Sequence, residues 1–238
     1  SVSGNDMETS LHRQLKALYA ESDDRTEIRF GRFRIDAVRG DELIEIQHGP
    51  LAAIRGKVTS LLAHHRVRVV KPIVLRKQLV KRAARGRRVV DRRMSPKRGS
   101  LLELFHDMVY FSRVFPHPNL MLEVPLVAVE EWRYPGHGRR RWRRQRDYQI
   151  EDQKLLQVAA VHCFRTARDL ATLLPADLPS PFHTQHLAQA LQIAPWFARQ
   201  IAYSLRETGA LKNVGKSRNW LLYQFVPQAA DAGGSAVL

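Results

Sequence analysis

The stretch "FRIDAVRGDELIEIQHG", residues 33–49, decides the fold because it predicts a β-hairpin with an acidic residue inside each strand. Gly40 and Asp41 separate two alternating runs, and glycine at the first central position favours a two-residue type II′ turn. This turn sets a register in which Asp36 lies opposite Glu45. One face is then apolar, with Phe33, Ile35, Ala37, Ile44 and Ile46, and the other carries Asp36, Glu45 and Gln47.

The opposed acids need compensation. Directly opposite Cβ atoms lie about 5 Å apart, and like charges at that distance destabilise a sheet. A shared proton, a nearby basic residue or a divalent cation would offset the repulsion. Mg²⁺ prefers oxygen ligands, so Asp36, Glu45 and the main-chain carbonyl of Ile46 are candidate metal ligands. The alternative is an ordinary solvated face on which Arg34 or Lys57 neutralises the pair.

Two amphipathic helices are predicted around this hairpin. The first spans residues 6–19, begins at a capping Asp6 and buries Leu11, Leu15 and Leu18. Glu8 falls on the same stripe. The second spans residues 51–65, with Lys57 beside its apolar stripe, from where it could reach the sheet or extend into solvent. That stripe comprises Leu51, Ile54, Val58, Leu61 and Leu62.

The predicted order of elements is helix, three strands, helix, strand. The strands cover residues 26–31, 33–39 and 42–48, and a buried strand at 66–75 follows the second helix. A helical connection between strands implies at least one parallel pair. The fold class is therefore α/β, with a mixed sheet flanked by helices.

Asp36, the short turn and Glu45-Ile46-Gln47, set in this order of elements, resemble the PD-(D/E)XK nuclease superfamily over residues 6–75. The resemblance implies a restriction-endonuclease-like sheet and a site that uses Mg²⁺ or Mn²⁺. Asp36 and Glu45 would hold the metal, and Glu8 resembles the first-helix acid of the Holliday-junction-resolvase-like branch. The third motif position is usually lysine. Here it is Gln47, and Lys57 is the candidate replacement.

The remaining sequence predicts further basic and apolar segments. A hairpin turns near Gly86 within residues 79–92, a helix spans 101–115, and a β-rich run covers 119–132. Residues 132–146 follow, with seven arginines among aromatic residues. We expect residues 1–150 to form the nuclease-like domain with basic insertions.

From about residue 152 the pattern is mostly helical. Helices at 182–193 and 194–209 precede two short strands around a Gly215–Ser217 turn, the layout of a winged helix-turn-helix. Residues 151–226 would then be a winged-helix-like DNA-binding domain, and 227–238 a flexible tail. A small helical subdomain that only packs on the first is the alternative. Its expected core is Trp196, Phe197, Ile201 and Leu205.

The charge balance predicts a polyanionic partner. The 238 residues contain 39 Lys and Arg against 23 Asp and Glu, a formal charge of +16. Nucleic acid is the expected partner, with Trp132, Tyr134 and Trp142 available to stack on unpaired bases. The candidate nucleic-acid contacts are Arg139, Arg140, Arg141, Trp142, Arg143, Arg199, Arg206, Lys212, Lys216 and Arg218.

Cys163 is the single cysteine, so it cannot form an intramolecular disulfide, and we expect it to be buried. No apolar run is long enough to span a bilayer and no signal peptide is visible, which predicts a cytoplasmic protein without membrane partners.

Two functions from different classes are consistent with these features. The first is a Mg²⁺-dependent DNA endonuclease in which Gln47 orients a water and Lys57 stabilises developing negative charge. The second is a catalytically inactive nuclease-like DNA-binding protein or regulator. Convergence of Glu8, Asp36, Glu45 and Lys57 would favour the enzyme. An RNA-binding or RNA-cleaving protein is a third possibility, and a homodimer would suit cleavage of both duplex strands.

Overall fold

The computed structural model describes residues 9–20, 22, 26–136 and 147–227. The chain divides into two compact units. The first comprises residues up to Asp107 together with His117–Arg165, and the second comprises Met108–Pro116 together with the chain from Thr166 onward. No helix among the described residues is long and apolar enough to cross a membrane.

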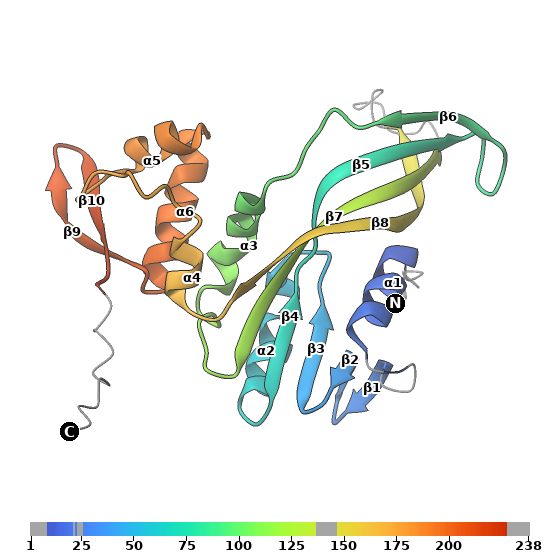
Figure 1. Ribbon diagram of the computed structural model, residues 1–238, viewed down its shortest axis with the longest axis horizontal. Helices are drawn as coiled ribbons and strands as arrows, with labels where there is room; N and C mark the ends of the chain where they lie inside the picture. The colour runs from blue at the N-terminus through green and yellow to red at the C-terminus, as the bar shows by residue number, and fades with distance from the viewer. Residues whose placement is uncertain (1–8, 21, 23–25, 137–146, 228–238) are drawn as a thin grey trace, which may run out of the picture. The chain divides into compact units, whose positions relative to one another are not determined.

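The first unit is an α/β structure built on one eight-stranded mixed sheet (Figure 1). The strand order is β1-β2-β3-β4-β7-β5-β6, and β8 also pairs with β7. The strands are β1 (Thr26–Phe30), β2 (Phe33–Arg39), β3 (Glu42–Ile46), β4 (Arg66–Val70), β5 (Ile73–Arg82), β6 (Val89–Met94), β7 (Leu120–Pro135) and β8 (Tyr148–Phe164). The helices are α1 (Ser10–Tyr19), η2 (Leu51–Ile54), α2 (Arg55–Leu62), η3 (Leu101–Glu103) and the start of α3 (Leu104–Phe111), which continues into the second unit from Met108.

The predicted hairpin register is confirmed. Arg39 pairs with Glu42 and Ala37 pairs with Ile44 across an antiparallel β2–β3 ladder. Gly40 has a φ of +56°, the left-handed value that the first central residue of a type II′ turn requires. The next strand, β4, runs parallel to β3, as the helical connection predicted.

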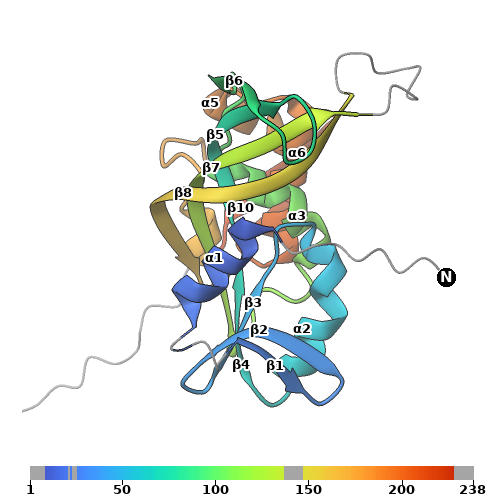
Figure 2. The same cartoon turned by 90° about the vertical axis from the view of Figure 1, so that its right-hand side faces the viewer.

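Figure 2 shows α1 and α2 on opposite sides of strands β2–β4. From α1, Leu11, Leu15 and Tyr19 pack in one core with Ile44 and Ile46 of β3. The apolar stripe predicted for residues 51–65 is buried throughout. Because helices cover both faces, every residue of β3 is buried, including its two glutamates.

Two predictions for α1 are wrong. Thr9 caps the helix by accepting a hydrogen bond from the His12 amide, so Asp6 is not the cap. Leu18 is 54% exposed, while Tyr19 is buried. With 3.6 residues per turn, Leu18 lies about 60° from the centre of the face that Leu11, Leu15 and Tyr19 bury, on the side away from the buried Lys16.

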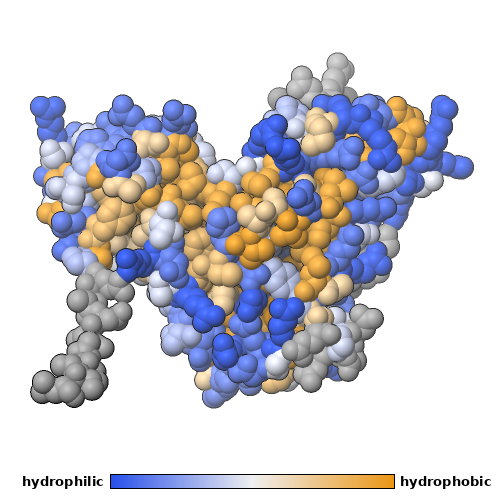
Figure 3. All heavy atoms as spheres, in the orientation of Figure 1, coloured by the Kyte–Doolittle hydropathy of each residue, from blue (hydrophilic) through white to orange (hydrophobic). Residues whose placement is uncertain are grey.

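The run predicted as one strand at 66–75 is two strands. β4 ends at Val70 and β5 begins at Ile73, with Pro72 at the break because proline has no amide hydrogen for a ladder. β5 and β6 form the expected basic hairpin, in which Gly86 has a φ of +69°. Its tip, at the right of Figure 3, is covered by hydrophilic side chains.

The helical pattern predicted from residue 152 is wrong up to Phe164. Residues 148–164 form β8, which pairs with β7 from Leu122–Phe164 to Pro135–Tyr148. Residues 151–164 therefore continue the sheet, and the boundary predicted at 150 moves to Arg165. Cys163 is exposed instead of buried, because strand alternation turns Phe164 inward and Cys163 outward.

The second unit contains three helices and a two-stranded sheet beyond residue 165. They are α4 (Ala167–Ala171), α5 (Thr184–Leu191), α6 (Pro195–Glu207), β9 (Leu211–Ser217) and β10 (Trp220–Phe225). The β9–β10 turn lies at residues 218–219, and Gly215 lies beside a bulge, so the turn predicted at Gly215–Ser217 is displaced. The predicted tail lies outside the described residues except for Pro227.

The expected core of this unit is mostly confirmed. Phe197, Ile201 and Leu205 are buried at the i, i+4, i+8 spacing of one helix face. Trp196 is 52% exposed, because it precedes Phe197 by one position and points away from that face.

Candidate active site at the β2–β3 hairpin

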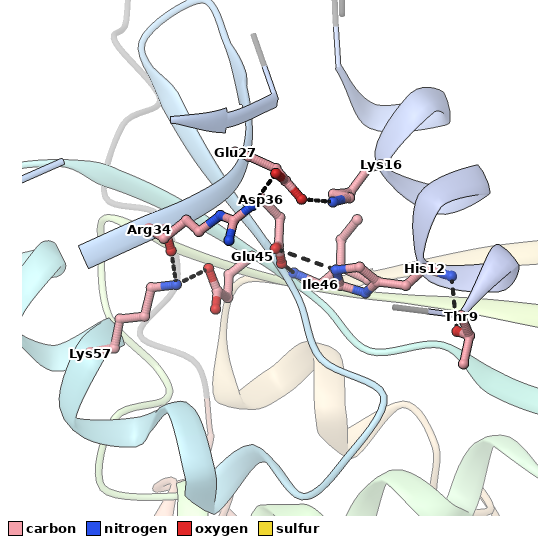
Figure 4. A network of polar contacts seen from close by, with 9 residues as sticks. All are labelled: Thr9, His12, Lys16, Glu27, Arg34, Asp36, Glu45, Ile46 and Lys57. Carbon is pink, nitrogen blue, oxygen red and sulfur yellow. Dashed lines mark hydrogen bonds and ion pairs between the residues drawn. The ribbon is translucent and has the colours of Figure 1, made fainter. Parts of the chain in front are cut away.

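Asp36 and Glu45 lie together at the hairpin, one register step beyond the Ala37–Ile44 pair. Glu45 is 7% exposed, and the Asp36 side chain is 20% exposed. The backbone amide of Ile46 donates a hydrogen bond to Asp36 Oδ2 at 2.7 Å. This bond crosses from β3 to β2 and fixes the aspartate against the next residue after Glu45 (Figure 4).

Lys57 reaches the pair from α2. Its Nζ lies 2.5 Å from Glu45 Oε2 and also donates to the main-chain carbonyl of Arg34. The lysine side chain is 18% exposed, so it points toward the sheet and not into solvent. Of the two positions that the sequence left open for Lys57, the structure shows the one that faces the sheet.

His12 is a member of this site that the sequence reasoning missed. Its Nε2 lies 3.4 Å from Asp36 Oδ1, and its ring centroid lies 5.3 Å from that of His48. The available signal was its place beside Leu11 on the inward side of α1. Figure 4 shows His12 and Lys57 approaching the two carboxylates from different helices.

The pKa values of the two acids are shifted in opposite directions. Burial and the negative charge of Asp36 raise the pKa of Glu45 to about 6, against the lowering effect of Lys57. Burial would also raise the pKa of Asp36, but hydrogen bonds from His12 and the Ile46 amide outweigh it and lower that pKa below its usual value. Such a divergence within a buried pair is common at functional sites.

Gln47 serves the loop after β3. Its backbone amide donates to the Val70 carbonyl at 2.9 Å, and its side-chain amide donates to the Pro50 carbonyl at 3.1 Å. Lys71 fixes the same loop through the Gly49 carbonyl, at 2.6 Å. Glu8, the remaining predicted site residue, lies outside the described residues.

Arg34 compensates a different acid. Its guanidinium pairs with Glu27, which also lies 2.5 Å from Lys16 Nζ. These two cations lower the pKa of Glu27, with the Lys16 hydrogen bond the larger cause. The Arg34 guanidinium therefore pairs with Glu27 and not with the Asp36–Glu45 pair. Its main-chain carbonyl accepts a hydrogen bond from Lys57, and Lys57 is the basic residue bonded to Glu45.

Within the described parts of the chain, no group of three or more His, Cys, Asp or Glu side chains could hold a metal ion. Mg²⁺ does not require such a group, because one or two carboxylates with waters and substrate phosphates commonly suffice. Lys57 bonds Oε2 of Glu45, while Oε1 accepts no hydrogen bond from a described residue. The donors present are hard oxygen atoms, the type that Mg²⁺ and Mn²⁺ accept.

The predicted nucleic-acid contacts are only partly described. Residues 139–143, with four arginines and Trp142, lie outside the described residues. In the second unit, Arg206 pairs with Glu207 at 2.7 Å. The others of that unit are exposed, namely Arg199, Lys212, Lys216 and Arg218.

The predicted stacking residues on β7 have partners inside the protein. Arg82 and Lys154 lie 4.3 and 4.9 Å from the centroid of the Trp132 ring, and its indole nitrogen donates to Glu130. The Tyr134 hydroxyl donates to the Gln149 side chain at 2.5 Å.

Comparison with known proteins places the first unit in one family. Residues 9–165 match the model described as "Domain of unknown function (DUF8091)". The chain belongs to the DUF8091 family. The match ends at the last residue of the first unit, so the family domain includes β8.

A relative from Treponema pallidum (strain Nichols), titled "Uncharacterized protein", is 30% identical over 184 residues. The alignment covers 76% of this chain and 72% of the relative. No solved structure matches the chain.

Proposed function

We propose that this protein is a metal-dependent endonuclease that hydrolyses phosphodiester bonds in DNA. The observation that carries the proposal is the buried Asp36–Glu45 pair, with Lys57 bonded to one acid and His12 beside the other. The protein is strongly basic, with a formal charge of +16, and the motif resembles that of PD-(D/E)XK nucleases.

The metal of this site would be Mg²⁺ or Mn²⁺, held by Asp36, Glu45 and the carbonyl of Ile46. A divalent cation bound there lowers the pKa of a coordinated water and stabilises charge on a phosphate. The Ile46 amide and His12 hold Asp36 in place from two directions, which preorganises one oxygen donor.

Lys57 has two roles in the proposal. It partly neutralises Glu45, which keeps a second carboxylate charged beside Asp36 at neutral pH. Its ammonium group also lies where negative charge would develop on a phosphate held by the pair. In this assignment Lys57 takes the place of the motif lysine, and Gln47 shapes the loop after β3.

The second unit would position the substrate. Its order of helices followed by the β9–β10 hairpin suits a winged-helix-like DNA-binding domain. Arg199 on α6 and Lys212, Lys216 and Arg218 on the hairpin would contact phosphates, which orient a protein on DNA without reading its sequence.

A second candidate is a catalytically inactive nuclease-like DNA-binding protein. The observation in its favour is Gln47, whose side-chain amide is bonded within its own loop at the position where the superfamily usually has lysine.

Cleavage of supercoiled and branched DNA separates these candidates. The wild type is compared with Asp36→Asn and Glu45→Gln, with Mg²⁺, with Mn²⁺ and with a chelator. We expect metal-dependent cleavage by the wild type alone, with equal DNA binding by all three proteins. Binding without cleavage under either metal would select the inactive DNA-binding protein.

A further inference from the structure

Two adjoining cavities lie along β5, β6 and β7 on one side of the sheet. The larger, of about 590 Å³, is lined in part by His48, Lys71, Lys77 and Lys97. The smaller, of about 280 Å³, is lined in part by Lys81 and Arg93. Arg133 and Tyr148 line both, so the cavities form one continuous feature, here named the groove.

The groove has an excess of positive charge. Six basic residues and four acidic residues line it. Lys71 is paired with Asp107 at 3.0 Å. Within the described residues, three other cations make no ion pair and remain available to an anionic ligand. They are Lys81, Arg93 and Lys97.

With the acid at its floor, the groove has six basic residues against five acidic ones, a net excess of one cation. Lys77 and Arg133 both pair with Glu131, which is fully buried, so two cations face one carboxylate. The burial of Glu131 below them holds the two cations at fixed positions along β5 and β7. A fixed row of cations suits the regularly spaced phosphates of a polynucleotide strand.

Tyr148 supplies an aromatic surface between the two cavities. The residue is 37% exposed, and the Arg133 guanidinium lies over one face of its ring, 3.9 Å from the ring centroid, so a base would stack on the opposite face. An aromatic ring among cations is the arrangement that binds single-stranded nucleic acid, because an unpaired base can stack on the ring. Bases in a duplex are stacked on each other and cannot reach it.

One wall of the groove depends on a glycine. A Cβ on Gly99 would lie 2.2 Å from the carbonyl oxygen of Val74, so glycine is needed for this close approach. The Gly99 amide donates to the Leu75 carbonyl at 3.2 Å, which holds the segment that carries Lys97 along β5.

The groove reaches the candidate active site through two histidines. His48 lines the larger cavity, its ring lies 5.3 Å from that of His12, and His12 Nε2 lies 3.4 Å from Asp36. A strand in the groove would therefore present a phosphate close to the carboxylate pair.

We propose that the groove binds single-stranded DNA and directs it to Asp36 and Glu45. This inference rests on the proposed nuclease function and makes its substrate a branched or frayed DNA with an unpaired strand. The recognition is chemical, through phosphates on the cations and a base on Tyr148, and it carries no sequence preference.

Fluorescence anisotropy with labelled oligothymidylate in a chelating buffer tests the groove without cleavage. We expect Tyr148→Ala to weaken binding roughly tenfold and Tyr148→Phe to restore it, since stacking is the interaction lost. The double variant Arg93→Ala, Lys97→Ala should reduce the salt slope of log K by roughly 1.4, about 0.7 for each lost phosphate contact.

Lys154→Ala is the matched control, because it removes one exposed cation that lies over Trp132, on the other face of β7 from Arg133. Asp36→Asn should bind oligothymidylate like the wild type even if cleavage is lost. A loss of cleavage with intact metal-free binding would therefore leave the groove standing. Circular dichroism melts verify that each variant is folded.

Three outcomes would overturn the proposal. One is an affinity for Tyr148→Ala no lower than that for Lys154→Ala. A second is equal competition by duplex and by unlabelled oligothymidylate, and a third is tighter binding of oligouridylate, which would assign RNA to the groove.

Discussion

Two buried glutamates in the same sheet have opposite electrostatic environments. Glu131 on β7 contacts Lys77, Arg133 and Gln153, and its pKa is lowered below the usual value because these hydrogen bonds and charges outweigh burial. Glu45 on β3 contacts Lys57 and lies beside Asp36, and its pKa is raised to about 6. Burial acts on both residues, so the difference comes from their neighbours.

From this difference we assign Glu131 to stability and Glu45 to the proposed function. Two cations and an amide for one carboxylate make a satisfied structural network. One lysine for two carboxylates leaves negative charge uncompensated in a buried place, which folding alone does not favour. Glu123 has a structural role like that of Glu131, since its carboxylate accepts a hydrogen bond from Tyr19 and pairs with Arg68.

The largest expected effect is on catalysis. Glu45→Gln should reduce metal-dependent DNA cleavage by at least about a thousandfold, because in the proposed mechanism it removes a charged metal ligand. Glu131→Gln should leave the cleavage rate of the folded protein near that of the wild type. The rates are compared at one temperature, chosen well below the melting temperature of every variant, so that all the proteins are folded. Equal loss in both variants would abolish the distinction between the two glutamates.

Lys57→Met should come next. It removes the basic residue bonded to Glu45, so we expect cleavage to fall about a hundredfold and the pKa of Glu45 to rise above about 6. Carbon-detected NMR titration of labelled glutamate carboxyls measures that pKa, and Lys77→Met is the matched control at Glu131. An unchanged Glu45 pKa in Lys57→Met would contradict the ion pair.

Glu131→Gln should lower the free energy of unfolding by about 2 kcal/mol, because it leaves Lys77 and Arg133 without their shared carboxylate. The two cations are 26% and 20% exposed, so water compensates part of the loss. The pKa of Glu131 is depressed in the folded state, so its contribution is present at neutral pH and lost as pH falls through that pKa. Urea unfolding of the wild type and of Glu131→Gln at pH 7 and at pH 4 measures the difference in unfolding free energy and its decrease at low pH.

The smallest expected effect is a gain in stability for Glu45→Gln, opposite in sign to the loss expected for Glu131→Gln. The folded-state pKa of Glu45 lies above the ordinary glutamate value of 4.5, so its contribution to stability is fully present below pH 4.5 and lost as pH rises through about 6. At pH 8 we expect Glu45→Gln to be more stable than the wild type by about 1 kcal/mol, since the loss of the Lys57 partner offsets part of the gain. If Glu45→Gln were less stable than the wild type at pH 8, Glu45 would have a stabilising role like that of Glu131.

The hairpin and its neighbours were predictable from sequence because local rules determine them. Gly40-Asp41 fixes the turn, the turn fixes the register, and alternation then places Asp36 near Glu45. The position of Lys57 beside a clear apolar stripe allowed its approach to the sheet but did not determine it.

Long-range contacts explain what sequence could not supply. β8 was mistaken for a helical region because its strand is stabilised by pairing with β7, which no local pattern reveals. His12 was missed because the buried face of α1 is centred nearer to Tyr19 than to Leu18. This orientation of the helix brings position 12 toward the core. The groove depends on residues from β5, β6, β7, β8, α3 and several loops that are distant in sequence.

The most direct test is Mn²⁺ binding, followed by electron paramagnetic resonance, in the wild type and in Asp36→Asn, Glu45→Gln and Glu131→Gln. Free Mn²⁺ gives the signal, so its loss on adding protein reports binding without any nucleic acid. We predict that the wild type and Glu131→Gln bind the ion and that the two hairpin variants do not. Undiminished binding by Asp36→Asn and Glu45→Gln would contradict the assignment of the metal to the β2–β3 pair.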